Sequence, residues 1–114
     1  MATRHYVPDA GDIVWLAFDP RAGHEQAGHR PAVVLSPSAY NGKIGLMVCC
    51  SLSTRIKGYP FEVAVQVDGQ PGVILSDQVK SLDWRARQAK KKGTVSEEAL
   101  VEVRAKIKAL LQLR

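Results

Sequence analysis

Short apolar stretches, separated by glycine, proline and asparagine, fill the first two-thirds of the chain. Such stretches are typical of β-strands, because branched and aromatic side chains pack well on a sheet and the separating residues favour turns. Residues 61–67 alternate as a half-buried strand does, whereas the uniformly apolar residues 32–35 indicate burial on both faces. We predict strands over residues 12–18, 32–35, 46–52, 61–67 and 72–75, a loop over 20–31 and a short turn over 37–42. This spacing predicts a small antiparallel barrel or sandwich.

The end of the chain changes to a helical period. Apolar side chains recur there at steps of three, four and three residues, namely at Leu100, Val103, Ile107 and Leu110. We therefore predict one amphipathic helix over residues 96–113. Its N-terminal cap is open between two alternatives, because Thr94 and Glu97 have the spacing of a capping box and Ser96 could act as the N-cap instead. Glu102 and Lys106, four residues apart, should pair on the helix surface.

The length and composition limit the architecture. A chain of 114 residues fits a single domain, which we expect to span residues 1–114, and 46% hydrophobic with 24% charged residues is ordinary for a soluble globular protein. A domain this small gains only modest stability from its own core, so a dimer interface would help. The chain has no apolar run of about 18–20 residues and no apolar segment at its start. We expect a cytoplasmic protein without membrane contact.

Positive charge is concentrated in one segment. The net charge is +5, and residues 80–92 contain six basic residues against Asp83 alone: Lys80, Arg85, Arg87, Lys90, Lys91 and Lys92. A clustered cationic face attracts polyanions such as nucleic acids. The alternative is a solvated surface that only keeps the protein soluble, and composition alone does not decide between the two.

The only two cysteines are neighbours, Cys49 and Cys50. In a strand they point to opposite faces, which disfavours a disulfide between them. Two cysteines cannot supply a four-ligand zinc site either, so we interpret both as buried, inert thiols and expect no metal or other cofactor.

Four motifs, in the expected order, resemble the MazF/PemK family of toxins. Residues 11–41 (GDIVWLAFDPRAGHEQAGHRPAVVLSPSAYN) are similar to the N-terminal half of these toxins and contain their G-x-E-Q-x-G-x-R-P-type signature at residues 23–31. Downstream, KGYPFEV (57–63), DQVKSLDWRAR (77–87) and KKGTV (91–95) match as well. The resemblance covers nearly the whole chain.

The resemblance implies both a fold and an activity. The fold would be mainly β with α, an SH3-like small antiparallel β-barrel of the CcdB/PemK kind with a C-terminal amphipathic helix. The family forms homodimers and cuts single-stranded RNA at a short base sequence without a metal. Attack by the 2′ hydroxyl leaves a cyclic phosphate and a free 5′ hydroxyl. A labile antitoxin, encoded beside the toxin, blocks the RNA groove.

The resemblance also assigns catalytic residues. The family's catalytic arginine corresponds to Arg30, whose planar guanidinium matches two phosphate oxygens, although a salt bridge to Glu25 that pins the loop is the alternative. The family's catalytic threonine corresponds to Ser53, and a shift of one residue would make it Thr54. For Glu25 we favour positioning of Arg30 and RNA contact, because a carboxylate beside a guanidinium is a weak base. His29 could shuttle protons near neutral pH.

Further positions are predicted to contact RNA. Lys57, Gln78 and Lys80 correspond to family positions that line the RNA groove, and lysines there would bind phosphates. The amides of Asn41 and Gln78 could read base edges on unpaired nucleotides. The remaining RNA contacts are expected from Thr54 and His29. The tryptophans, Trp15 and Trp84, are expected in the core rather than stacked on bases.

Two other functions remain as alternatives. CcdB-type toxins share the fold and poison DNA gyrase by binding, but they need a C-terminal Trp-Gly-Ile, whereas this chain ends in Leu113-Arg114 within the predicted helix. A catalytically inactive relative that only binds nucleic acid is the second alternative, because position 53 carries a serine.

Overall fold

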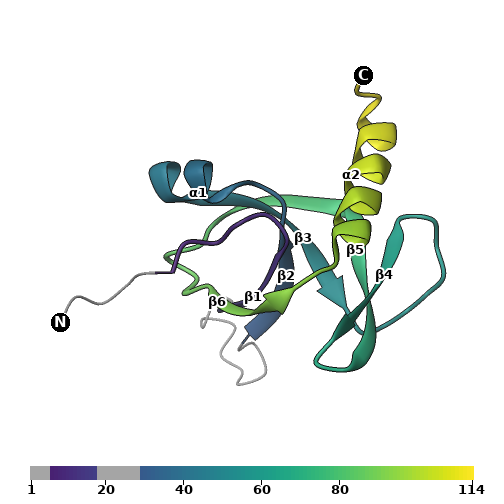
Figure 1. The fold of residues 1–114 in the computed structure, drawn as a ribbon, viewed down its shortest axis with the longest axis horizontal. Helices are drawn as coiled ribbons and strands as arrows, with labels where there is room; N and C mark the ends of the chain where they lie inside the picture. Colours follow the sequence, from purple (N-terminus) through teal and green to yellow (C-terminus); the bar gives the residue numbers. More distant parts are fainter. Residues whose placement is uncertain (1–5, 18–28) are drawn as a thin grey trace.

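Six strands and two helices make up the part of the chain that the structure describes. This computed structural model describes residues 6–17 and 29–114. In chain order the elements are β1 (Asp12–Ala17), β2 (His29–Val34), α1 (Ser38–Ile44), β3 (Leu46–Ser53), β4 (Glu62–Val67), β5 (Gln70–Asp83), β6 (Lys90–Thr94) and α2 (Glu97–Leu111). The strands form one antiparallel sheet in the order β4-β5-β3-β2-β1-β6, which curls into a half-barrel (Figure 1). The predicted fold, mainly β with a C-terminal helix, is confirmed.

Each face of the curled sheet carries its own apolar core, because successive strand residues point to opposite sides. The first core packs against α2 and consists of Ile13, Val33, Cys50, Leu52, Val63, Ile74, Ala99 and Val103. The second core uses the alternate strand positions and consists of Val14, Leu16, Ala32, Val34, Met47, Cys49 and Trp84. The cavity described below lies beside the second core, on the face away from α2.

Helix α2 fits the predicted helix closely, with small differences at its ends. Ser96 is the N-cap, and its side chain accepts a hydrogen bond of 3.1 Å from the backbone N–H of Ala99. The cap therefore follows the second of the two alternatives. The helix ends at Leu111 rather than at residue 113, because Gln112 adopts a left-handed conformation (φ 59°). Glu102 and Lys106 form the expected pair at 3.8 Å.

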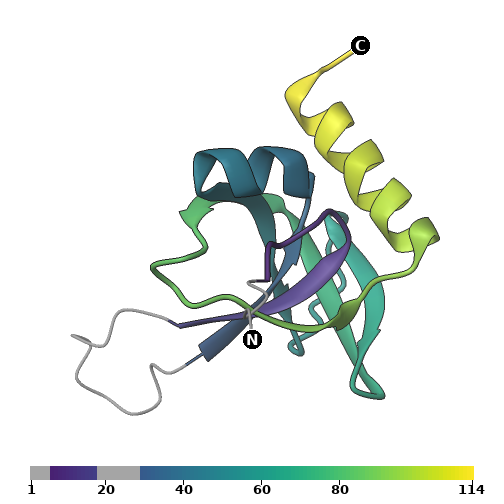
Figure 2. The same cartoon turned by 60° about the vertical axis from the view of Figure 1, so that its left-hand side comes forward.

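The apolar stripe of α2 is buried only over its first half. Val103 is fully buried, whereas Leu110 remains 44% exposed. The reason is visible in Figure 2, where the C-terminal end of α2 extends beyond the sheet. No helix within the described ranges is both long and apolar enough to cross a membrane.

A helix replaces the turn that was predicted over residues 37–42. α1 spans Ser38–Ile44 and follows the extended Pro37. It ends at Gly45, whose φ of 86° is a left-handed conformation that glycine adopts without strain. The prediction of a turn here was wrong. A helix of seven residues is too short to show a clear helical period in the sequence.

Strands β5 and β6 also depart from the sequence expectation. β5 runs over fourteen residues, whereas only residues 72–75 were predicted, and β6 was not predicted at all. The added part of β5 pairs with β3, from Cys50 opposite Val79 to Leu46 opposite Asp83. Polar and charged side chains dominate both missed segments, because each has largely exposed residues.

A register shift between β3 and β5 shapes the site. Cys50 pairs with Val79, while Leu52 pairs with Ile74. Ser51 alone on β3 therefore faces residues 75–78 on β5. Irregularities of this kind bend a strand away from its partner and are frequent beside active sites.

Candidate active site

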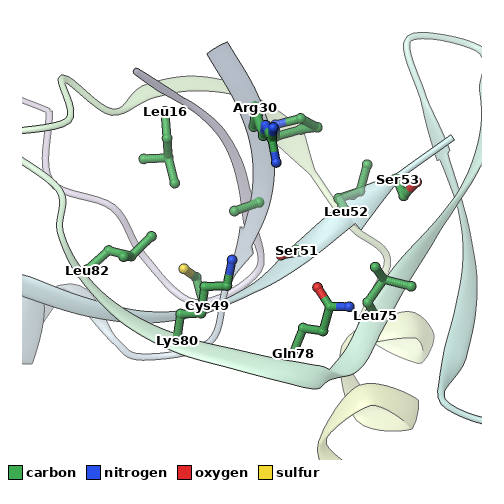
Figure 3. A pocket seen from close by; sticks show the side chains of 12 residues that line it. Leu16, Arg30, Cys49, Ser51, Leu52, Ser53, Leu75, Gln78, Lys80 and Leu82 are labelled. Carbon is green, nitrogen blue, oxygen red and sulfur yellow. The ribbon is translucent and has the colours of Figure 1, made fainter. Parts of the chain in front are cut away.

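A cavity of about 290 Å³ lies between β1, β2, β3 and β5 (Figure 3). Its polar lining is Arg30, Ser51, Ser53, Gln78 and Lys80, and its apolar lining is Leu16, Pro31, Ala32, Cys49, Leu52, Leu75 and Leu82. A cavity with apolar walls and a few convergent polar groups is the usual form of a ligand site.

Strand alternation and register explain why these polar groups converge. Ala32 on β2 pairs with Ser51 on β3, and Cys49 on β3 pairs with Lys80 on β5. Directly opposite residues share a face, so positions two residues along each strand share it too. Continuing the β2–β3 register by two residues places Arg30 opposite Ser53. The sheet thus brings Arg30, Ser53 and Lys80 to one face.

The two cations give the cavity its electrostatic character. Arg30 comes from the start of β2 and Lys80 from β5, and both side chains line the cavity. A guanidinium offers paired donors to two phosphate oxygens, and an ammonium adds a compact positive charge. This combination suits an anionic ligand such as a phosphodiester.

Of the two candidate hydroxyl residues, the structure places Ser53 in the cavity lining and leaves Thr54 exposed outside it. The Ser53 Oγ accepts a hydrogen bond of 3.0 Å from the backbone N–H of Arg55. That contact fixes the side chain at the end of β3 and leaves its O–H available as a donor.

Gln78 and Lys80, two of the residues predicted to contact RNA, line the cavity, whereas Lys57 lies on the adjoining loop. The Glu62 carboxylate holds this loop by accepting hydrogen bonds from the backbone N–H groups of Lys57 (2.9 Å) and Gly58 (2.8 Å). The Tyr59 hydroxyl donates to Asp77 at 2.8 Å and so joins the loop to β5 next to Gln78. The exposed Lys57 side chain therefore extends from a fixed loop beside the cavity.

The prediction that Asn41 reads RNA bases is wrong, because its side chain is fully buried within α1. Its Nδ2 donates to the carbonyl oxygens of Pro8 (2.7 Å) and Ser36 (2.9 Å), and its Oδ1 accepts from the Ser36 hydroxyl at 2.6 Å. The Asn41 backbone carbonyl accepts from the indole of Trp84 at 2.9 Å. Asn41 is a structural residue that joins α1 to the segments around it.

His29 does not join Arg30 in the cavity. The two are neighbours on β2, so their side chains point to opposite faces. The His29 ring packs edge-on against Trp15, with centroids 6.5 Å apart and planes at 83°. Trp84 is a core residue, as expected. Trp15, also expected in the core, is only half-buried and belongs to neither core, and the Lys92 ammonium lies over its ring at 5.5 Å. The structure thus gives no support to a proton shuttle by His29 in this cavity.

The basic segment is not one continuous face. Arg85 lies over the Trp84 ring at 4.6 Å and donates to the Gly42 carbonyl at 3.1 Å, which fixes the turn after β5. Lys91 pairs with Asp12 at 3.6 Å, and Lys92 pairs with Asp68 at 3.8 Å. Lys80 is the member of the segment that lines the cavity. Arg85, Lys91 and Lys92 therefore contact other parts of the protein and do not line the cavity.

A family model, described as PemK-like, MazF-like toxin of type II toxin–antitoxin system, matches residues 9–111. The chain belongs to this toxin family. It is 58% identical over 106 residues to the endoribonuclease toxin MazF of Escherichia coli K12, which covers 93% of this chain and 96% of that protein. The endoribonuclease toxin ChpB of the same strain is 34% identical over 110 residues, covering 91% and 94% of the two chains.

Solved structures agree with this assignment. The fold is similar to a chain in a MazE–MazF crystal structure from Deinococcus radiodurans, with a TM-score of 0.87, 51% identity, and coverage of 96% of this chain and 100% of that chain. A crystal structure of MazF from the same organism gives a TM-score of 0.83 at 54% identity, with the same coverage. The MazF-like fold therefore extends over almost the entire chain.

Glu25, the candidate for orienting Arg30, lies outside the described residues.

The two cysteines are buried, as predicted. Burial raises the pKa of Cys49 from 9.0 to about 11 and the pKa of Cys50 to about 12, so both thiols stay protonated near neutral pH. Within residues 6–17 and 29–114, no group of three or more His, Cys, Asp or Glu side chains could hold a metal ion.

Sequence reasoning missed Ser51. This residue is half-buried and lines the cavity beside Ser53 and Gln78. The available signal was its spacing: within a strand, Ser51 lies two residues before Ser53 and must share its face.

Proposed function

We propose that this MazF-like chain is an endoribonuclease toxin that cuts single-stranded RNA, and that the cut occurs at the Arg30 cavity. The observation that carries the proposal is the convergence of Arg30 and Lys80 with serine hydroxyls on one cavity, a combination that suits a phosphodiester. Relatives that cover nearly the whole chain, and bear the name endoribonuclease toxin, support it.

The reaction is an internal transfer at phosphorus. The 2′ oxygen loses its proton and bonds to the adjacent phosphorus, while the bond from phosphorus to the 5′ oxygen breaks and that oxygen gains a proton. The products are a cyclic 2′,3′-phosphate and a 5′ hydroxyl, and no water is consumed. The protein must stabilise the crowded anionic phosphorane between these states.

Arg30 supplies most of that stabilisation in our proposal. Its guanidinium brings a positive charge, and its paired donors fit two phosphorane oxygens. The Ser53 hydroxyl assists from the opposite strand. Glu25 orients Arg30 and contacts RNA rather than acting as the general base, because a carboxylate next to a guanidinium is a weak base.

RNA binding extends from the cavity to its rim. Lys80 binds a phosphate within the cavity, and Gln78 beside it reads the edge of an unpaired base. Lys57 and Thr54, exposed on the loop that follows β3, add contacts along the RNA strand. The recognised base sequence depends on these loops.

We further propose that the chain is a cytoplasmic homodimer, needs no metal or other cofactor, and is neutralised by a cognate antitoxin. Crystal structures titled MazE–MazF, to which this chain is similar, support the antitoxin partner. The exposed apolar end of α2, with Leu110 44%, Leu111 59% and Leu113 57% exposed, supports an association that covers it.

The test is cleavage of a long single-stranded RNA by the purified chain in EDTA, with end-group analysis of the products. We expect discrete cuts with cyclic phosphate and 5′ hydroxyl ends. Arg30→Ala should slow cutting by about 100-fold or more and largely preserve RNA affinity, because the lost charge acts mainly on the phosphorane. Arg104→Ala, an exposed arginine on α2, is the matched control.

Two results would contradict the proposal. RNA that is retarded but stays intact would show that the chain is a nucleic-acid-binding relative without catalysis. Normal cutting by Arg30→Ala would show that the active site lies elsewhere.

A further inference from the structure

Ser51 lines the cavity from β3. Its partner on β2 is Ala32, whose methyl group is too small to cover it. On the other side, β5 leaves β3 at the register shift, so that Ser51 faces the arch of residues 75–78 instead of a single paired residue. Figure 3 shows Ser51 between Arg30 and Gln78. The fold thus leaves this side chain open to the cavity.

The Ser51 hydroxyl also has unused hydrogen-bonding capacity. Among the described residues, none forms a hydrogen bond with it, and because no buried polar side-chain atom in those ranges lacks a partner, its oxygen reaches solvent. Other serines in the sheet differ. The Ser76 hydroxyl donates to the Phe61 carbonyl at 2.5 Å, and the Ser53 oxygen accepts from the backbone of Arg55.

The arch opposite Ser51 is held in place by its own contacts. Ser76, fully buried, bonds to Phe61 through both its backbone N–H (3.0 Å) and its hydroxyl. Asp77 accepts from Tyr59 at 2.8 Å. Within the described residues, the arch that borders Ser51 is therefore held in place by its own hydrogen bonds.

Two positively charged residues, Arg30 and Lys80, lie on the strands beside Ser51. Arg30 lies two residues before Ala32 on β2, and Lys80 pairs with Cys49, two residues before Ser51 on β3. Diagonal neighbours of this kind have Cα atoms about 7–8 Å apart, within reach of one phosphate for long side chains. A hydroxyl between two cations is well suited to donate to an anionic oxygen that both cations attract.

We propose that Ser51 is a substrate-contacting residue whose hydroxyl donates a hydrogen bond to a non-bridging oxygen of the phosphate that Arg30 binds. This role rests on the proposed function. This contact is additional to the role of Ser53, whose oxygen already accepts a hydrogen bond from the backbone N–H of Arg55. Ser51 stabilises the extra negative charge of the phosphorane together with Arg30.

The test compares Ser51→Ala with Ser81→Ala. Ser81 is a matched control because it pairs with Val48 and is exposed on the face of the sheet away from the cavity. The substrate is a short single-stranded RNA with one cleavage site, and kcat/KM is measured for each protein. Ser51→Ala should lower kcat/KM by about 10- to 100-fold, the usual effect of losing one hydrogen bond to a charged group. Ser51→Cys, of similar shape but with a weak donor, should follow Ser51→Ala.

A second measurement tests the contact itself. Each non-bridging oxygen of the cleaved phosphate is replaced in turn by sulfur, a poor hydrogen-bond acceptor. Sulfur in place of the oxygen that Ser51 contacts should slow cleavage by the natural protein. It should slow cleavage by Ser51→Ala much less, because that variant already lacks the hydrogen bond. A role in folding alone would not produce this difference.

The outcomes separate the two proposals. If the natural protein cuts and Ser51→Ala cuts equally fast, or is slower with an unchanged sulfur effect, the Ser51 inference is overturned and the proposed function stands. If the natural protein cuts no RNA, both proposals are overturned.

Discussion

Asn41 and Arg30 show how the same kind of evidence, a polar residue in a matching motif, leads to different roles. Asn41 has a 0% exposed side chain and three hydrogen bonds to protein groups, so RNA cannot reach it. Arg30 is exposed at the cavity. Burial therefore decides between a structural and a binding role where residue type does not.

Asn41→Ala should consequently affect stability. The substitution leaves the buried carbonyls of Pro8 and Ser36 without their partner, which typically costs about 2–4 kcal/mol in the free energy of unfolding. Urea unfolding measures this loss. Gln78→Ala, in the cavity, is the control and should change the midpoint little while weakening RNA binding. A stable Asn41→Ala protein with impaired RNA binding would reinstate the base-reading role.

Residue types in the site could be predicted from the sequence, but the faces on which they lie could not. The family resemblance identified Arg30, Ser53, Gln78 and Lys80, and the structure brings these four together. His29 was included because it precedes Arg30 in sequence, yet alternation along β2 sends it to the other face. The spacing of Ser51 from Ser53 could have placed it on the same face, but its opening to the cavity results from a register shift between β3 and β5, which the local sequence does not show.

At the scale of elements, predictability followed the length of the periodic signal. α2 has fifteen residues with a repeated apolar stripe and a capping serine, so both its type and its start were recognisable. α1 has seven residues, and helices this short form only when tertiary contacts hold them. Those contacts, from Asn41 to Pro8 and from Trp84 to Asn41, join residues that are far apart in the sequence.

Strands β5 and β6 failed to show a strand pattern for a different reason. β6 is an edge strand that pairs only with β1 and carries three lysines, which discourage pairing with other molecules. The second half of β5 is largely exposed, so its side chains need not be apolar. The polar composition of these two segments therefore follows from their position in the sheet, which the sequence pattern does not show.

The cap of α2 offers a test at this scale. Ser96→Ala removes the acceptor for the Ala99 N–H and should lower the free energy of unfolding by about 1 kcal/mol. Thr94→Ala is the matched control, because Thr94 is exposed at the end of β6 and does not cap the helix; it should cost a few tenths at most. Thermal or urea unfolding of both variants gives the comparison. A larger loss for Thr94→Ala would favour the capping box that the structure does not use.

At the scale of the whole molecule, the curled sheet separates positive charge onto two faces. Lys80 lines the cavity on one face. Lys92 lies on the other, over Trp15 and 3.8 Å from Asp68. A chain with a net charge of +5 attracts RNA from all sides, yet only the charges that contact phosphates release counterions on binding. The net charge of the protein and the number of its charges that contact phosphates can therefore be measured separately.

The salt dependence of RNA binding measures this separation. For a single-stranded RNA with a 2′-deoxy group at the cut, the slope of log Kd against log salt should fall by about 0.7 in Lys80→Gln, because one phosphate contact is lost. Lys92→Gln removes the same charge from the opposite face, where Asp68 already pairs with it, and should leave the slope unchanged. Both variants have the same net charge, so any difference between them reports contact rather than general attraction. Equal slopes for the two variants would mean that RNA is not confined to the cavity face.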